Sequence, residues 1–87
     1  MTKDIFDQMI AKARAAGLHT EAYPKTWMIN CEDVDGTVQS FYTTTGTAVF
    51  RDGNGRRAKR VTVRNMDFNR FIELCVGETA DILEIYF

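Results

Sequence analysis

The sequence predicts an α+β domain, in which two helices cover one face of an antiparallel sheet of four to five strands. Three features of the sequence support this prediction. Apolar residues recur with the period of a helix in two segments, they alternate with polar residues in several shorter runs, and glycine-marked turns separate those runs. The expected order is α-β-β-β-β-α-β. We expect a single domain over residues 1–87, because 45% of the residues are hydrophobic and ten are aromatic.

The first helix is expected over residues 3–16, where apolar side chains form one stripe of helical period. Thr2 is placed to act as the N-cap, and Gly17 can take the left-handed conformation that ends many helices. Residues 19–25 are expected to form a connection, ended by the rigid Tyr23-Pro24 pair.

The first predicted hairpin pairs a strand at residues 27–32 with a second strand at residues 37–42. Apolar and polar residues alternate in the first strand, so that Trp27, Ile29 and Cys31 are expected to share one face. The Asp35-Gly36 pair between the strands favours a type I′ turn, in which both central residues have positive φ.

The second predicted hairpin pairs residues 47–51 with residues 56–64, and a turn at residues 43–46 precedes it. Its tip, residues 52–55, is polar and contains two glycines, so we expect it to be the most mobile part of the chain. In the returning strand, Val61 and Val63 should share one face, and Arg60, Thr62 and Arg64 should share the other.

Apolar residues of helical period return near the C-terminus and predict a second helix over residues 66–76, with Asn65 as the N-cap and Gly77 at the end. Residues 81–87 are short and β-prone, so we expect a last strand there, at the edge or in the centre of the sheet. A terminal helix is the alternative.

Positive charge is concentrated in residues 51–64, which hold six cations and one anion, whereas the rest of the chain holds five cations and eleven anions. The two parts therefore carry charges of +5 and −6. Guanidinium groups bind phosphate through paired hydrogen bonds, and a two-stranded ribbon fits the DNA major groove. We therefore expect the binding site at this hairpin, with Tyr42 as an exposed aromatic: Arg51, Arg56, Arg57, Lys59, Arg60, Arg64 and Tyr42.

Other interpretations of the charge stay open. A charged hairpin also protects a sheet edge from pairing with another chain, and it could contact an acidic patch on a protein. The acidic residues, such as Glu32, Asp33 and Glu84, could imitate phosphate groups in the basic groove of a nuclease, or could be ordinary surface residues. Tyr86 is a second aromatic expected at the surface.

The tract at residues 41–47, Phe-Tyr-Thr-Thr-Thr-Gly-Thr, together with Trp27 and Asp67-Phe68, resembles small proteins of phages, plasmids and prophages. These proteins carry an aromatic-Tyr-Pro-Thr-Thr-Gly tract between two strands, and this chain has Thr43 at the usual position of proline. The resemblance implies a mobile genetic element as the setting and assigns no functional residue. Anti-CRISPR inhibitors are similar only in size and in their plan of helices and a small sheet.

The sequence contains no catalytic or metal-binding signature. His19 is the only histidine and is not accompanied by a Ser or Cys motif or an obvious orienting acid, and the glycines at 53 and 55 are not followed by the Lys-Ser/Thr of a P-loop. Cys31 and Cys75 lie in apolar runs, where we expect them to pack as small hydrophobic residues. We therefore expect no enzymatic activity, no catalytic residue, no cofactor and no metal.

No apolar run approaches the ~20 residues of a membrane span, and the N-terminal residues do not resemble a signal peptide. We expect a cytoplasmic protein, acting in the host cell, that is a monomer or a homodimer. Its predicted function is non-enzymatic binding of nucleic acid, or of a host protein that handles nucleic acid, through the basic hairpin. The alternative is an anti-defence inhibitor of the anti-CRISPR type, which binds a host nuclease by protein–protein contacts.

Overall fold

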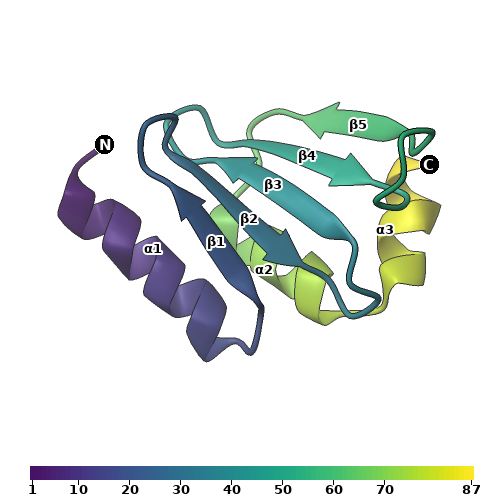
Figure 1. Cartoon of the computed structure of the whole chain (residues 1–87), viewed down its shortest axis with the longest axis horizontal. Coiled ribbons are helices and arrows are strands. Elements are labelled where there is room, and N and C mark those ends of the chain that lie inside the picture. Colours follow the sequence, from purple (N-terminus) through teal and green to yellow (C-terminus); the bar gives the residue numbers. More distant parts are fainter.

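Five antiparallel strands form an open sheet in which each strand pairs with its neighbour in the sequence (Figure 1). The computed structural model describes all residues, 1–87. The predicted α+β class is confirmed, with five strands and three helices. The strands are β1 (Thr20–Tyr23), β2 (Met28–Glu32), β3 (Val38–Tyr42), β4 (Thr47–Arg51) and β5 (Arg60–Val63).

Three helices pack against one face of the sheet: α1 (Lys3–Ala15), α2 (Phe68–Val76) and α3 (Thr79–Tyr86). In α1, Thr2 Oγ1 accepts a hydrogen bond from Ile5 N–H at 3.2 Å, and Gly17 takes a φ of 91° after the last turn. The first predicted helix is therefore confirmed to within one residue.

Aromatic rings join α2 and α3 to the central strands. Phe41 on β3 lies 5.1 Å from Phe68 and 5.3 Å from Phe71, measured between ring centroids. Phe50 on β4 stacks on Phe71 at 5.8 Å and on Tyr86 at 4.8 Å. The four phenylalanines belong to a single core of 15 buried hydrophobic residues, and Tyr86 packs against this core.

The predicted strand at residues 81–87 is wrong, because this segment belongs to α3. Ile82 and Tyr86 are four residues apart, so a helix directs both side chains to the same side. Ile82 is fully buried and Tyr86 stacks on Phe50. Tyr86 is therefore half-buried. The expectation that it would be exposed at the surface is wrong.

The expected connection at residues 19–25 contains β1, which pairs with β2 along its whole length. This strand has only four residues; its side chains alternate in burial, but Thr-Glu-Ala-Tyr contains no large aliphatic residue that would mark a core face in the sequence. Pairing with β2 decides its conformation, because the edge of β2 would otherwise leave backbone groups without partners.

Three predicted details at turns and helix ends are also corrected. Only Gly36 has a positive φ in the β2–β3 turn, so the turn is not type I′. Asn65 takes a φ of 56°, and Asp67 is the N-cap of α2. Trp27 takes a φ of 53° immediately before β2, which places its ring 5.1 Å from Phe6 of α1.

Candidate functional site

The sheet face opposite the helices is not covered by any element of the chain (Figure 1). Its side chains alternate along each strand with those of the core, because successive residues of a strand point to opposite faces. The register arranges them in rows across the sheet. The first row, the aromatic row, consists of Tyr23, Met28, Tyr42 and Thr47.

A second row crosses the middle of this face and consists of Glu21, Asn30, Ser40, Val49 and Thr62. In the third row, the charged row, Glu32 pairs with Val38 and Arg51 pairs with Arg60. The open face therefore carries negative charge at the β1–β2 end and positive charge at the β4–β5 end.

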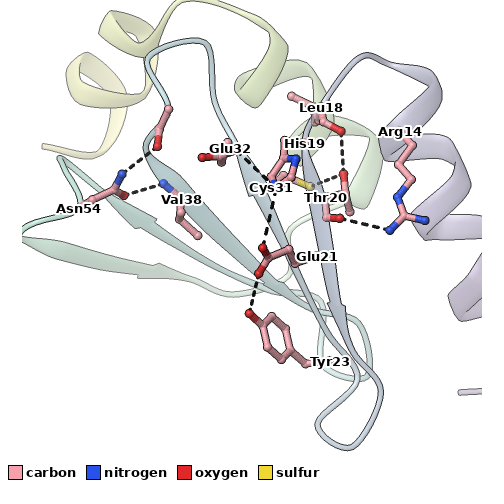
Figure 2. A network of polar contacts seen from close by, with 11 residues as sticks. Arg14, Leu18, His19, Thr20, Glu21, Tyr23, Cys31, Glu32, Val38 and Asn54 are labelled. Atoms are coloured by element: carbon pink, nitrogen blue, oxygen red, sulfur yellow. Dashed lines mark hydrogen bonds and ion pairs between the residues drawn. The ribbon is translucent and has the colours of Figure 1, made fainter.

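The acidic end of the open face is organised around the single histidine. His19 Nε2 lies 3.8 Å from a carboxylate oxygen of Glu21 and 3.8 Å from one of Glu32 (Figure 2). The Tyr23 hydroxyl donates to Glu21 at 2.9 Å, and this hydrogen bond with the glutamate charge raises the pKa of Tyr23. His19 is thus engaged by two acids and is not paired with a nucleophile.

Arg51 lies flat across β3 on the open face. Its Nη1 donates to the Val38 carbonyl and to Ser40 Oγ, both at 3.0 Å, and Ser40 Oγ donates to Asn30 at 2.6 Å. The guanidinium covers Ser40, which is only 1% exposed although it belongs to the open face. Partial burial lowers the pKa of Arg51 and the Arg60 cation lowers it further, whereas Tyr42 raises it.

The backbone of Arg51 is held by a side chain from the covered face. Gln39 is fully buried; its Oε1 accepts from the Arg51 N–H at 2.7 Å, and its Nε2 donates to the Arg51 carbonyl at 3.1 Å. The same Nε2 also donates to Asp33 at 3.1 Å, and Asp33 Oδ1 accepts from the backbone N–H groups of Asp35 and Thr37. The β2–β3 turn therefore fixes the position of Arg51 before any ligand binds.

The loop at residues 52–59 folds back onto this turn, and the predicted long strand at residues 56–64 is reduced to β5. Asn54 Oδ1 accepts from Val38 N–H at 2.9 Å, and Asn54 Nδ2 donates to the Gly36 carbonyl at 2.8 Å (Figure 2). Asp52 accepts from Lys59 N–H at 2.8 Å at the base of the loop. The basic loop is thus attached to the β2–β3 turn and does not extend as a separate two-stranded arm.

A hollow of about 440 Å³ lies between this loop and the open face. Three guanidinium groups line it, and no carboxylate does. The complete lining is Val38, Arg51, Gly53, Asn54, Gly55, Arg56, Ala58 and Arg60. With its arginines and its polar loop, the hollow is suited to an oxygen-rich anion such as a phosphate group.

The structure brings only some of the predicted site residues together. Arg51, Arg56 and Arg60 meet at the hollow, and Arg64 follows β5 toward the aromatic row. Arg57 and Lys59 are exposed on the loop outside the hollow. Tyr42 lies on the open face as expected, with 37% of its surface exposed.

None of the six cations in residues 51–64 forms an ion pair. The ion pairs of the chain are Lys3–Asp7 and Arg70–Glu73, and the contacts of His19 with Glu21 and Glu32 lie outside this region. A cation cluster without its own counter-ions leaves these charges available to an external anion.

Sequence reasoning did not identify Asp33, Gln39 or Asn54 as residues that build the site. Asp33 was grouped with the surface acids, although an aspartate three residues before a turn glycine is typical of side-chain capping of a turn. A glutamine on the core side of a β-prone run indicates a buried polar pairing, because an unpartnered amide inside a core is costly. Asn54 carries no comparable signal, since its partners come from a different hairpin.

Both cysteines are buried and free, in agreement with their expected packing in the core. Burial raises the pKa of Cys31, and burial together with Cys31 and Asp33 raises the pKa of Cys75 strongly. No group of three or more His, Cys, Asp or Glu side chains is arranged to hold a metal ion. No helix combines the length and the apolar character that a membrane crossing would require.

No family model, no curated protein and no solved structure matches this chain.

Proposed function

We propose that this protein is a non-enzymatic binding protein that contacts the phosphate groups of nucleic acid through the hollow. The observation that carries the proposal is the convergence of Arg51, Arg56 and Arg60 on one hollow without a carboxylate. Phosphate accepts paired hydrogen bonds from guanidinium groups, and such charge-assisted bonds are stronger than neutral ones. Lys59, Arg57 and Arg64 would add charge around this centre.

Electrostatics inside the hollow favour an anion. Partial burial lowers the pKa of Arg51, and the nearby Arg60 cation lowers it further, because the two positive charges repel each other. A phosphate between them would relieve this repulsion. The Arg51 backbone is already positioned by Gln39, so less conformational freedom would be lost on binding.

The setting of the protein is part of this proposal. The tract at residues 41–47 resembles small proteins of mobile elements, and on that basis we place this protein in the cytoplasm of a host cell, encoded by a phage or another mobile element. Binding without catalysis is part of the same proposal.

The test measures binding to labelled nucleic acid by fluorescence anisotropy over a series of salt concentrations. We expect binding that weakens as salt rises, and a salt slope that becomes less steep by about 0.7 to 0.9 for each phosphate contact removed. Arg56→Ala and Arg60→Ala are the test variants, since both side chains are exposed. Arg70→Ala, an equal loss of charge on α2, is the control. Absence of binding at low salt, or equal effects of all three variants, would overturn the proposal.

A second candidate is an anti-defence inhibitor that binds a host nuclease through protein–protein contacts. The mixed character of the open face favours it, because Tyr42 on β3 lies between the basic end and the acidic end, which carries the second exposed tyrosine, Tyr23. This candidate predicts a stable complex with a CRISPR nuclease and loss of target-DNA binding by that nuclease. Unchanged cleavage and target loading across a panel of such nucleases would exclude it.

A further inference from the structure

The shape of the basic region argues against insertion into a DNA groove. The loop at residues 52–59 is tied to the β2–β3 turn, and β5 has only four residues. Arg51 and Arg60 therefore lie on a broad sheet face. Five strands span about 19 Å from edge to edge, whereas the major groove is about 12 Å wide. A surface of this width can contact a flexible single strand more closely than the floor of a groove.

An exposed aromatic ring lies on the same half of the open face as the arginines. β5 ends at Val63, which pairs with Ala48, and Arg64 follows it directly; Thr47, the residue before Ala48, pairs with Tyr42 on β3. Continuing the register by one residue would put Arg64 about 10 Å from Tyr42, two strand spacings. Arg60 begins β5 and Arg64 comes directly after its last residue, so the two arginines are about 13 Å apart along the chain.

Negative charge at the β1–β2 end of the open face limits how far the proposed phosphate-binding surface extends. Glu21 and Glu32 lie on β1 and β2, and their charge would repel a phosphate backbone. Tyr23, which lies at this end, is 41% exposed and is therefore similar in exposure to Tyr42. Its hydroxyl is bound to Glu21, so this tyrosine stands beside a negative charge instead of a positive one.

From this arrangement we infer that the ligand is single-stranded nucleic acid, lying across the β3–β5 half of the open face with a base stacked on Tyr42 and phosphates at Arg64 and in the hollow. The inference depends on the proposed function and specifies its ligand. Stacking on an aromatic side chain requires an unpaired base, which a single strand offers and a continuous duplex does not. Every base has such a face, so this arrangement selects for strandedness and not for sequence.

The experiment compares fluorescein-labelled single strands of DNA and RNA, about 12 nucleotides long, with duplexes of the same sequence at one salt concentration. We expect the single strands to bind at least tenfold more tightly than the duplexes. Tyr42→Ala should weaken single-strand binding about fivefold or more, and Tyr42→Phe, which keeps the ring, should bind almost as well as the intact protein. Tyr23→Ala is the matched control and should change the affinity by less than about twofold.

The possible outcomes separate this inference from the proposed function. Salt-dependent binding that is equal or stronger for the duplex, or that responds equally to Tyr42→Ala and Tyr23→Ala, would overturn the single-strand inference and leave phosphate binding intact. Absence of binding to all probes would overturn both, as would an interaction with an acidic protein alone. Thermal unfolding followed by circular dichroism shows whether each variant is folded, and Tyr42→Phe tests the role of the ring in a variant that preserves packing.

Discussion

The two faces of the sheet use alternate residues of the same strands, yet they differ in almost every physical property. On β4, Ala48 and Phe50 are fully buried under the helices. Val49 and Arg51 alternate with them along the strand, face outward and are partly exposed. The covered face contains stacked rings and a closed core, and the open face contains charges of opposite sign at its two ends. Adjacent residues of one strand can therefore have different roles: one side chain packs in the core, and the next is available to contact a ligand.

The two faces are connected at one point. Gln39 belongs to the covered face and holds the backbone of Arg51, whose side chain lies on the open face. The covered face and the open face are therefore not independent of each other. Substitutions in the core should affect stability, substitutions on the open face should affect binding, and a substitution at Gln39 should affect both.

The largest expected effect is on the covered face. Phe50→Ala removes a ring that stacks on Phe71 and Tyr86, and it should lower the free energy of unfolding by about 3–5 kcal/mol. Val49→Thr, one residue earlier on the open face, should change it by less than about 1 kcal/mol. Urea denaturation followed by circular dichroism measures both values. Equal losses would show that the open face is also part of the packed core.

The next effect concerns the connection between the faces. Gln39→Leu keeps the size of the side chain but leaves the N–H and C=O of Arg51 and one oxygen of Asp33 without their partner. The expected loss of stability is about 2–3 kcal/mol, and phosphate binding should weaken in the fraction that remains folded. Urea denaturation and anisotropy measure the two effects. A loss of stability without any change in binding would show that Arg51 does not need this support.

A smaller effect should appear at alkaline pH, where a buried thiol of the core, Cys75 on α2, contributes to it. The Cys75 thiol ionises near pH 9.0 in the unfolded chain, whereas burial raises its pKa in the folded protein. Above pH 9.0 the unfolded chain therefore binds fewer protons than the folded protein, and stability falls as the pH rises.

Between pH 9.0 and pH 10 stability should fall by about 1 kcal/mol through this thiol, and well below pH 9.0 the thiol should have little effect. Urea denaturation at several pH values measures it. In Cys75→Ser, which has no thiol at this position, the decline should be reduced by that amount. The same decline in both proteins would contradict the effect of burial on this group.

The smallest effect is expected at the basic loop. Asn54→Ala removes hydrogen bonds to Val38 and Gly36 at an exposed site, and it should cost about 1 kcal/mol or less. The sharper measurement is hydrogen exchange of the Val38 amide, which should become faster. Asn54→Asp retains the acceptor for this amide and should protect it partly. Unchanged exchange in both variants would show that the loop is not held by Asn54.

Several parts of the candidate site were predictable from local sequence. The alternation in residues 60–64 correctly placed Arg60 on the face opposite Val61 and Val63, and the β-prone run before the Thr-rich turn placed Tyr42 on a strand. The convergence of Arg51, Arg56 and Arg60 was not predictable, because it depends on a loop that bends toward another hairpin. The predicted strand over residues 56–64 was too long for the same reason, since only Arg60–Val63 form β5.

Local pattern was sufficient for α1, β3 and β4, because their side-chain periods and turn residues act over a few positions of the chain. It was insufficient for β1, whose conformation depends on pairing with β2, and for α3, whose partners lie far away in the sequence. Ile82 and Tyr86 form one buried side of a helix only once Phe50 and the rest of the core are in place. Asn54 reaches Val38 across 16 positions, and such contacts form only after the strands have paired. The composition of the chain thus established a charged, mixed α+β domain, whereas tertiary packing decided which charges meet on the open face.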